Sequence, residues 1–280
     1  MARTCMIVLL TMVSLAGPGW AQTPLGPPGT VSFGVVPQQT SRQLARVWTP
    51  ILTYLHTKTG YDFWLQTATD IPTFEARVAA GAYDLAYMNP YHYVVFHQMP
   101  GYVAFAKEKA QQVRGIVVVH KDSPYQTLPE LRHHTLAFPA PAAFAASVLT
   151  QAHLAEKGVP FTSVYVVSHD SVYLSVAQGL YVAGGGMLRT LQMAPLAVRN
   201  QLRILWTSPP YPSHAFAAHP RVPMAIVAQV LHALEAMHQD PEGLALLQPL
   251  QVEGIDAAQD SEWDAVRTLP IQVVPPREGP

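Results

Sequence analysis

Short apolar runs alternate along the first part of the chain with segments in which apolar residues recur at helical spacing. Residues 31–36 form an apolar run closed by Pro37, which is typical of a buried parallel strand. Apolar residues then recur every three or four positions over 44–55, until Gly60, and this predicts a helix. The pattern continues as strand, helix, strand and the start of another helix at 61–67, 70–81, 84–88 and 89. Repeated units of this kind predict an α/β fold with helices flanking a parallel sheet.

A second series of similar units begins after Arg114. Its apolar pattern predicts strands at 115–120, 135–138, 164–167, 182–186 and 202–206. It predicts helices between and after them, at 128–132, 142–157, 170–178, 223–238 and 261–269. We therefore expect two lobes, each a mainly parallel sheet flanked by helices. The first lobe would comprise residues 31–110 and 211–280, and the second residues 111–210.

The chain is expected to cross between the lobes twice, near residues 105–114 and 207–214, the second time through a proline-rich segment. Two crossing strands leave a cleft between the lobes. In open α/β sheets the carboxyl ends of the strands and the helix N-termini face such a cleft. The functional residues are therefore expected there.

The first 21 residues have the pattern of a secretory signal peptide. Arg3 precedes an apolar run over residues 5–16, and small residues follow, with Ala21 directly before the expected cleavage site. Residues 22–30 are rich in Pro and Gly and are expected to form a solvated lead-in. Cleavage would release a secreted mature protein and remove Cys5, the one cysteine. A mature chain without thiols excludes disulfides, thiolate nucleophiles and cysteine zinc sites.

Composition narrows the classes of function further. The chain has 280 residues, of which 49% are hydrophobic and 12% charged, with a formal net charge of −1. These values exclude a disordered chain, and they give no basic surface for nucleic acid. No apolar run reaches the length of roughly 18 residues that a membrane-spanning helix needs.

Several short segments, in this order, resemble one family. They are Phe33-Gly34-Val35-Val36-Pro37, Trp48-Thr49-Pro50, Asp84-Leu85-Ala86-Tyr87-Met88-Asn89-Pro90, Val119-His120-Lys121-Asp122-Ser123-Pro124 and Ser168-His169-Asp170-Ser171. From Phe33 to Trp263 the chain is similar to the phosphate, phosphite and phosphonate substrate-binding proteins of ABC transporters, which have the two-lobed type II periplasmic-binding-protein fold. The resemblance implies capture of a small solute by a monomer and its delivery to a membrane permease, without catalysis, cofactor or metal.

The resemblance also implies which residues bind the ligand. They lie at strand ends and helix starts that face the cleft: Gln38, Gln39, Tyr87, Asn89, Tyr93, Ala143, Phe144, His169 and Asp170. Asp170 also fits the role of helix N-cap.

One loop departs from the family pattern. The family carries Ser or Thr at the start of a helix that holds the oxyanion, whereas this chain has Ala143, Phe144 and Ala145 at those positions. A hydrogen bond to a charged group is worth about 1.5–3 kcal/mol, so losing two would cost about two to four decades in affinity. The altered loop favours a less charged, partly apolar ligand.

Catalysis and metal binding have little support in the sequence, whereas two alternative functions stay open. Ser168, His169 and Asp170 are adjacent in sequence and so cannot form a catalytic triad, and the histidines have no metal-ligand spacing. One alternative is a ligand-sensing accessory protein for an envelope histidine kinase. Another is a carrier of a less polar ligand, which Phe144 and Trp64 would suit.

Overall fold

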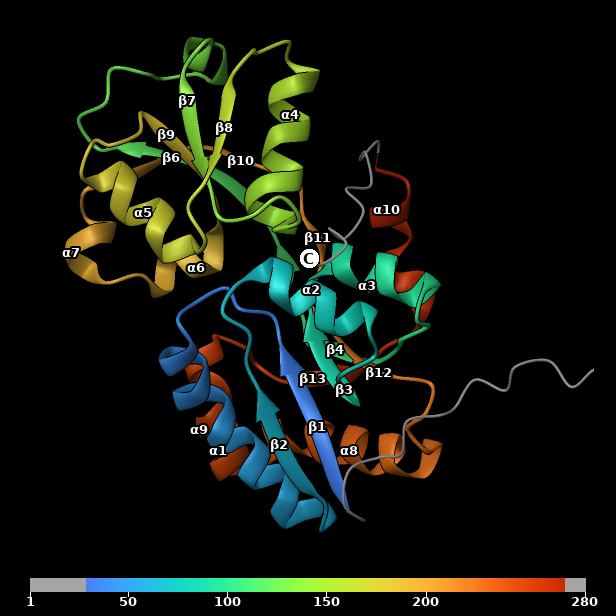
Figure 1. The fold of residues 1–280 in the computed structure, drawn as a ribbon. Coiled ribbons are helices and arrows are strands. Elements are labelled where there is room, and N and C mark those ends of the chain that lie inside the picture. Colours follow the sequence, from blue (N-terminus) through green and yellow to red (C-terminus); the bar gives the residue numbers. More distant parts are fainter. Residues whose placement is uncertain (1–28, 270–280) are drawn as a thin grey trace, which may run out of the picture.

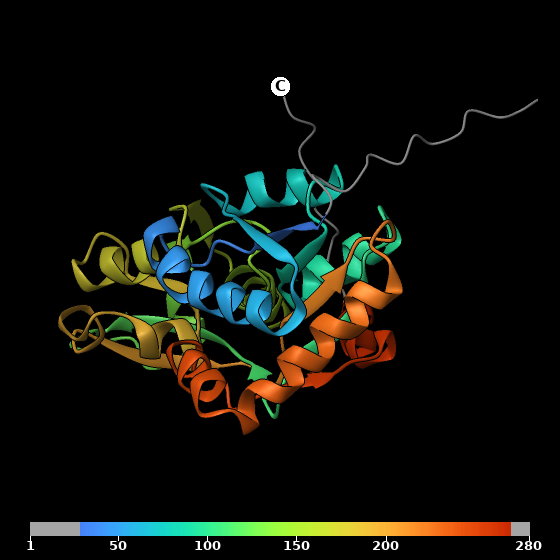
Figure 2. The ribbon, with the colours of Figure 1, turned by 90° about the horizontal axis from the view of Figure 1, so that it is seen from below.

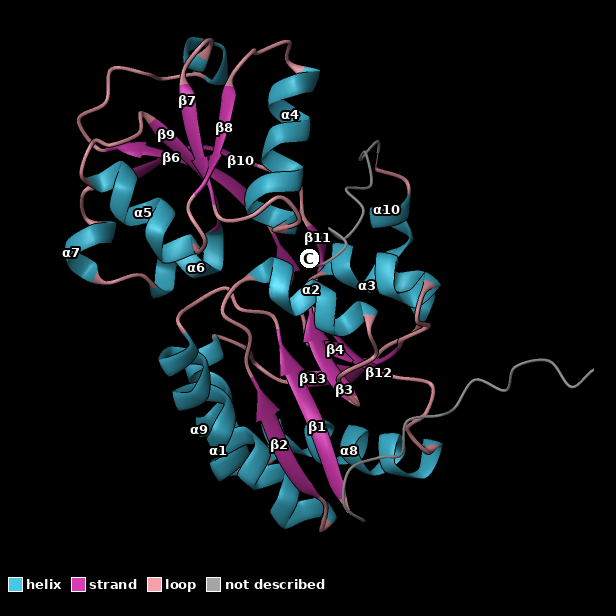
Figure 3. Ribbon diagram, in the orientation of Figure 1, coloured by secondary structure: helices cyan, strands magenta, loops and turns pink. Residues whose placement is uncertain are grey.

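The computed structural model of the protein describes residues 29–269, in which two α/β lobes are joined by a narrow connection (Figure 1). Figure 3 shows that helices flank the sheet of each lobe. The predicted signal peptide, nearly all of the lead-in and residues 270–280 lie outside the described residues. Within residues 29–269, no helix combines the length and apolar character that crossing a membrane requires.

The first lobe is built on a six-stranded sheet with the strand order β13-β4-β12-β3-β1-β2. Its strands are β1 (Thr30–Val35), β2 (Asp62–Gln66), β3 (Leu85–Met88), β4 (Val103–Glu108), β12 (Ala215–Ala218) and β13 (Ile255–Ala257). Its helices are α1 (Ser41–Thr59), α2 (Ile71–Ala79), α3 (Pro90–Gln98), α8 (Met224–Ala236), η3 (Met237–Gln239), α9 (Pro241–Leu247), η4 (Gln248–Leu250), η5 (Asp260–Trp263) and α10 (Asp264–Arg267). Helices α1 and α2 lie on opposite faces of this sheet (Figure 2).

The second lobe is built on a five-stranded sheet with the order β10-β6-β9-β7-β8. Its strands are β6 (Gly115–His120), β7 (Thr135–Phe138), β8 (Thr162–Tyr165), β9 (Ala183–Met187) and β10 (Leu202–Thr207). Its helices are η1 (Leu128–Leu131), the π-helix η2 (Phe144–Leu149), α4 (Thr150–Glu156), α5 (His169–Ala177), α6 (Leu188–Met193) and α7 (Leu196–Arg199).

A two-stranded antiparallel ribbon connects the lobes. It pairs β5 (Gln112–Val113) with β11 (Tyr211–Pro212) and lies between the two sheets in Figure 1. Strand β6 follows β5 directly into the second lobe, and β12 follows β11 back into the first. The two crossing segments expected from the sequence are therefore the two strands of this ribbon.

Both sheets are mixed, so the expectation of mainly parallel sheets is wrong in this detail. β1 pairs in parallel with β2 and β3, but β12 is antiparallel to β3 and β4. In the second lobe β6 is antiparallel to both β9 and β10. The reason is the crossing itself. A strand that enters a lobe from the ribbon must run opposite to the strands that end beside the ribbon.

The segment predicted as one helix over 142–157 has a different form in the structure. The chain winds first as the π-helix η2 from Phe144 and becomes α-helical only in α4. This helix start packs directly on the sheet. The approach is so close that a Cβ atom on Gly115 would collide with the Ala145 carbonyl oxygen, and one on Gly185 with the Ala146 carbonyl oxygen. The glycine-rich β9 thus brings the loop before η2 close to the sheet and to the first lobe.

Candidate functional site

Two helices begin beside the ribbon with well-formed N-termini, one from each lobe. Asn89 follows β3 and caps α3, since its Oδ1 accepts a hydrogen bond from the His92 N–H at 2.8 Å. In α5, Ser168 rather than the expected Asp170 is the N-cap, and its Oγ accepts from the Ser171 N–H at 3.1 Å. The backbone N–H groups of a first helical turn have no intrahelical acceptor, so both helix starts favour negative charge.

A small cavity lies between these helix starts and draws its walls from both lobes and from the ribbon. Its volume is about 10 Å³, which is room for about one water molecule. Its lining is Gln38, Ile71, Asn89, Val113, Ala143, Phe144, Ala145, His169, Met187 and His214. The cavity therefore brings together five of the residues singled out from the sequence, which are Gln38, Asn89, Ala143, Phe144 and His169.

The lobes touch directly around this cavity. The Asn89 side chain donates from Nδ2 to the Ala142 carbonyl at 3.2 Å, which joins the start of α3 to the loop before η2. The Phe144 ring packs edge-on against Tyr211 of the ribbon, with ring centroids 5.5 Å apart. Phe144 is 1% exposed, so its ring forms part of the wall between the lobes.

His214 was not singled out from the sequence, yet it lines the cavity. The Gln38 amide donates from Nε2 to His214 Nε2 at 2.9 Å, so the proton of the neutral ring lies on Nδ1. His214 is 1% exposed, and within residues 29–269 its Nδ1 has no hydrogen-bond partner. Burial, together with the nearby charge of Arg189, holds the pKa of His214 well below its usual value. The ring is therefore a neutral donor.

His169 is the other imidazole in the cavity wall. Its Nδ1 lies 3.1 Å from the Thr190 hydroxyl, which is itself hydrogen-bonded to Tyr173. Burial lowers the pKa of His169 to about 4. Both cavity histidines are therefore uncharged near neutral pH.

A buried ion pair spans the lobes beside the cavity. Arg189 in α6 donates from Nη1 to Glu108 Oε1 at the end of β4, at 2.6 Å, and from Nη2 to the Tyr87 hydroxyl at 3.1 Å. The Tyr87 hydroxyl donates to the same Glu108 oxygen. The Glu108 side chain is 2% exposed and that of Arg189 15%. Burial alone would lower the pKa of Arg189, but Glu108 and Tyr87 outweigh it and raise that pKa.

Tyr87 connects the ion pair to the cavity. Its ring stacks on His214 with centroids 5.0 Å apart and the planes 14° from parallel. Tyr87, Gln39 and Arg189 also line a neighbouring space of about 30 Å³. Tyr87 and Gln39 thus lie next to the cavity rather than in its wall.

Two further residues singled out from the sequence lie elsewhere. Tyr93 is in the interior of the first lobe, where its hydroxyl donates to Asp260 at 2.5 Å and its ring packs on Trp263. Asp170 is partly buried at the start of α5, and burial raises its pKa, but it lines neither space. In the part of the chain that the structure describes, no group of three or more His, Cys, Asp and Glu could hold a metal ion.

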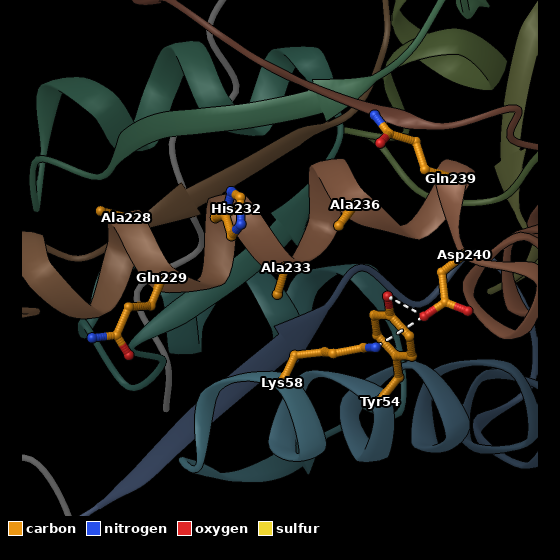
Figure 4. A pocket seen from close by; sticks show the side chains of 9 residues that line it. All are labelled: Tyr54, Lys58, Ala228, Gln229, His232, Ala233, Ala236, Gln239 and Asp240. Atoms are coloured by element: carbon orange, nitrogen blue, oxygen red, sulfur yellow. Dashed lines mark hydrogen bonds and ion pairs between the residues drawn. The ribbon is translucent and has the colours of Figure 1, made fainter.

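A larger groove than the interlobe cavity lies on the first lobe alone. It has a volume of about 720 Å³ and runs between α1 and α8, with Ala233 and Ala236 in its lining (Figure 4). At its edge Asp240 accepts from the Tyr54 hydroxyl at 3.1 Å and pairs with Lys58 at 3.0 Å. It contains none of the residues that the sequence singled out.

Two α/β lobes, joined by a pair of crossing strands and enclosing a small cavity between helix starts, define a type II periplasmic binding protein. A family model described as "ABC transporter, phosphonate, periplasmic substrate-binding protein" matches residues 33–263, and the chain belongs to this family. The family is periplasmic, and its members are substrate-binding components of transporters rather than enzymes.

Individual relatives agree with this assignment. The chain is 23% identical over 259 residues to the phosphate-import protein PhnD of Mycolicibacterium smegmatis, an alignment that covers 84% of this chain and 79% of that protein. The binding protein component of an ABC phosphonate transporter from Pseudomonas aeruginosa has a similar structure, with a TM-score of 0.78, 17% identity and coverage of 85% of this chain and 84% of that one. PhnD1 of Prochlorococcus marinus, solved in complex with methylphosphonate, also has a TM-score of 0.78, with 14% identity and coverage of 86% and 97%.

Proposed function

We propose that this protein captures a small solute between its two lobes in the periplasm and delivers it to the permease of an ABC transporter. The observation that carries the proposal is the interlobe cavity, whose lining combines Gln38, Asn89 and His214 from the first lobe with His169 from the second. Lobes that close on a ligand bury it between residues of both, and release it by bending at the connection. The ribbon of β5 and β11 is the connection that would bend.

In this proposal the first lobe comprises residues 31–110 and 211–280, and the second comprises residues 111–210, as expected from the sequence. The cavity-lining polar residues, with Gln39 and Tyr87 beside them, are the binding residues of this proposal. In this proposal the signal peptide is cleaved after Ala21, and the mature chain acts in the periplasm as a monomer.

The loop before η2 sets what kind of solute is held. Its side chains at Ala143, Phe144 and Ala145 supply no hydroxyl, so an oxyanion would be held there by backbone N–H groups alone. Ile71, Val113 and Met187 complete the apolar part of the wall. The ligand of this site is therefore small, with one polar end and tolerance for an apolar group.

A solute screen on the purified mature protein tests the proposal. Thermal unfolding and small-angle scattering are measured with phosphate, phosphite, methylphosphonate and other small solutes. A ligand at about 100 times its Kd adds about 2.7 kcal/mol of stability. It should raise the melting temperature and, by closing the molecules that are open, reduce the radius of gyration. A panel in which no solute does either would refute capture between the lobes.

Co-purification from the native envelope tests the delivery step. Recovery of a permease and its ATPase supports transport, whereas recovery of a histidine kinase would favour the sensing role instead. Mass spectrometry of the protein after gentle purification identifies the bound solute. A lipid found there would favour the carrier of a less polar ligand.

A further inference from the structure

The interlobe site has an unusual charge balance. None of the residues that line the cavity is Asp, Glu, Lys or Arg. The polar groups in its wall are the amides of Gln38 and Asn89 and the two imidazoles, which are neutral in the closed protein. The cavity as it stands has room for about one water molecule, so a ligand must part the lobes to enter, and it then meets hydrogen-bonding groups but no full positive charge in the wall.

The nearest full positive charge is already neutralised. Arg189 does not line the cavity: its guanidinium donates to the Tyr87 hydroxyl, whose ring stacks on His214, and is paired with Glu108 at 2.6 Å. Both members of the pair are buried, so water screens one from the other only weakly. The Glu108 carboxylate therefore opposes the charge of Arg189 at the cavity, although that charge still contributes to the lowered pKa of His214 in the cavity wall.

The other charged groups near the cavity do not change this balance. Behind α3, Glu75 Oε1 lies 3.0 Å from His92 Nε2, so that carboxylate is partnered by an imidazole. Asp170 lies at the start of α5 outside the cavity wall. Arg114 donates to the Ser208 carbonyl at 3.3 Å and lines a neighbouring space of about 380 Å³, which Glu108 and Arg189 also line, but it does not line the cavity.

The positive potential that remains is small and comes from the helix starts. The N-termini of α3 and α5 each carry about half an elementary charge. Beside them His214 contributes a buried N–H with no partner in the described residues. These groups suit one negative charge, whereas a second negative charge would have no cation to balance it.

We infer that the site selects ligands carrying a single negative charge over doubly charged ones, and that Glu108, by cancelling the charge of Arg189, is the residue that sets this preference. The inference rests on the proposed capture of a solute between the lobes and names the charge class of that solute. A singly charged tetrahedral oxyanion, such as a protonated phosphate or phosphonate or its monoester, is the chemistry that fits.

A series of variants at the ion pair tests the role of Glu108. Glu108→Gln leaves one positive charge beside the cavity, Arg189→Gln leaves one negative charge, and the double variant restores the balance. The probe is inorganic phosphate, and its Kd is measured calorimetrically at pH values on either side of its second ionisation. The readout is the ratio of dianion to monoanion affinity. Breaking the ion pair also alters how easily the lobes close, but that effect cancels in the ratio.

The expected order of this ratio follows the charge beside the cavity. In a medium of effective dielectric about 20, an uncompensated unit charge within about 10 Å of the ligand changes the ratio by on the order of tenfold or more. The ratio should favour the monoanion in the wild type, rise by that order in Glu108→Gln and fall in Arg189→Gln. The double variant should return it toward the wild-type value. Glu130→Gln, which removes a charge from the exposed surface of the second lobe, is the matched control and should not change it.

Equal ratios across the series, or a wild-type preference for the dianion, would overturn the inference. If Glu108→Gln does not fold, as judged by circular dichroism, the wild type, Arg189→Gln and the double variant still give the comparison. A wild type that binds neither form of phosphate also overturns it. The proposed function survives that result if another solute closes the lobes, and fails separately if none does.

Discussion

The loop before η2 offers a direct measure of how this site holds oxyanions. Ala143 and Ala145 are 2% and 4% exposed and lie in the cavity wall. Ala143 is also the residue before the first turn of η2, where its extended backbone suits a serine cap. Ala143→Ser therefore introduces one hydroxyl at the helix start with the smallest possible change in volume.

The expected gain can be estimated from the single hydrogen bond that this hydroxyl would donate to a bound oxyanion. Such a bond to a charged acceptor is worth about 1.5–3 kcal/mol, or roughly 10- to 150-fold in affinity. Phe144→Ser is a poorer test, because removing a buried ring that packs on Tyr211 would cost about 3–5 kcal/mol of stability. The smaller substitution separates binding from folding.

Calorimetric titration of inorganic phosphate into the wild type and Ala143→Ser measures the effect. Ala142→Ser is the matched control, since Ala142 is equally buried in the same loop but its side chain does not line the cavity. Tighter phosphate binding by Ala143→Ser alone is the expected result. An unchanged Kd in Ala143→Ser would refute the placement of this loop against the ligand.

Three further predictions concern residues around the site. Tyr93→Phe should destabilise the fold by about 1–2 kcal/mol, through loss of the hydrogen bond to Asp260, and leave solute affinity unchanged; weaker solute binding at unchanged stability would instead place Tyr93 in the site. Burial lowers the pKa of His169 from 6.5 to about 4, so the unfolded chain binds the proton first and stability is lost as the pH falls from about 6.5 toward 4. Melting temperatures measured across that range should fall less steeply in His169→Gln than in the wild type, and parallel curves would contradict the assignment. Gly185→Ala should destabilise the second lobe by about 1–3 kcal/mol or more, because the new Cβ would collide with the Ala146 carbonyl and the Phe138 ring; an unchanged denaturation midpoint would count against this packing.

The sequence alone predicts the strands and helices whose apolar patterns are strong. The buried strands 115–120 and 135–138 are found at those bounds, because continuous apolar runs closed by turn residues leave little choice. The strands β4 and β13 were not predicted. Both contain charged residues, Lys107 and Glu108 in one and Asp256 in the other, and they form strands through pairing with segments far away in the sequence.

The site residues that could be predicted are likewise those marked by a local sequence pattern, and the ones that depend on contacts distant in sequence were missed. Asn89 and His169 were found because a strand end followed by a helix start is visible locally. His214 and the Glu108–Arg189 pair were missed, because they reach the cavity through the crossing ribbon and through a contact between the lobes. The position of His214 directly before an apolar segment that returns from the ribbon is the one signal that could have identified it.

The direct contacts between the lobes have a consequence for how binding strength should be interpreted. The bond from Asn89 to Ala142 and the ion pair of Arg189 with Glu108 favour closure by themselves. A solute that enters must first find the protein open, and its apparent Kd is the intrinsic Kd divided by the fraction of open molecules. Substitutions that weaken these contacts could therefore tighten apparent binding without touching the solute, and a weak measured affinity would reflect competition from self-closure as much as poor complementarity.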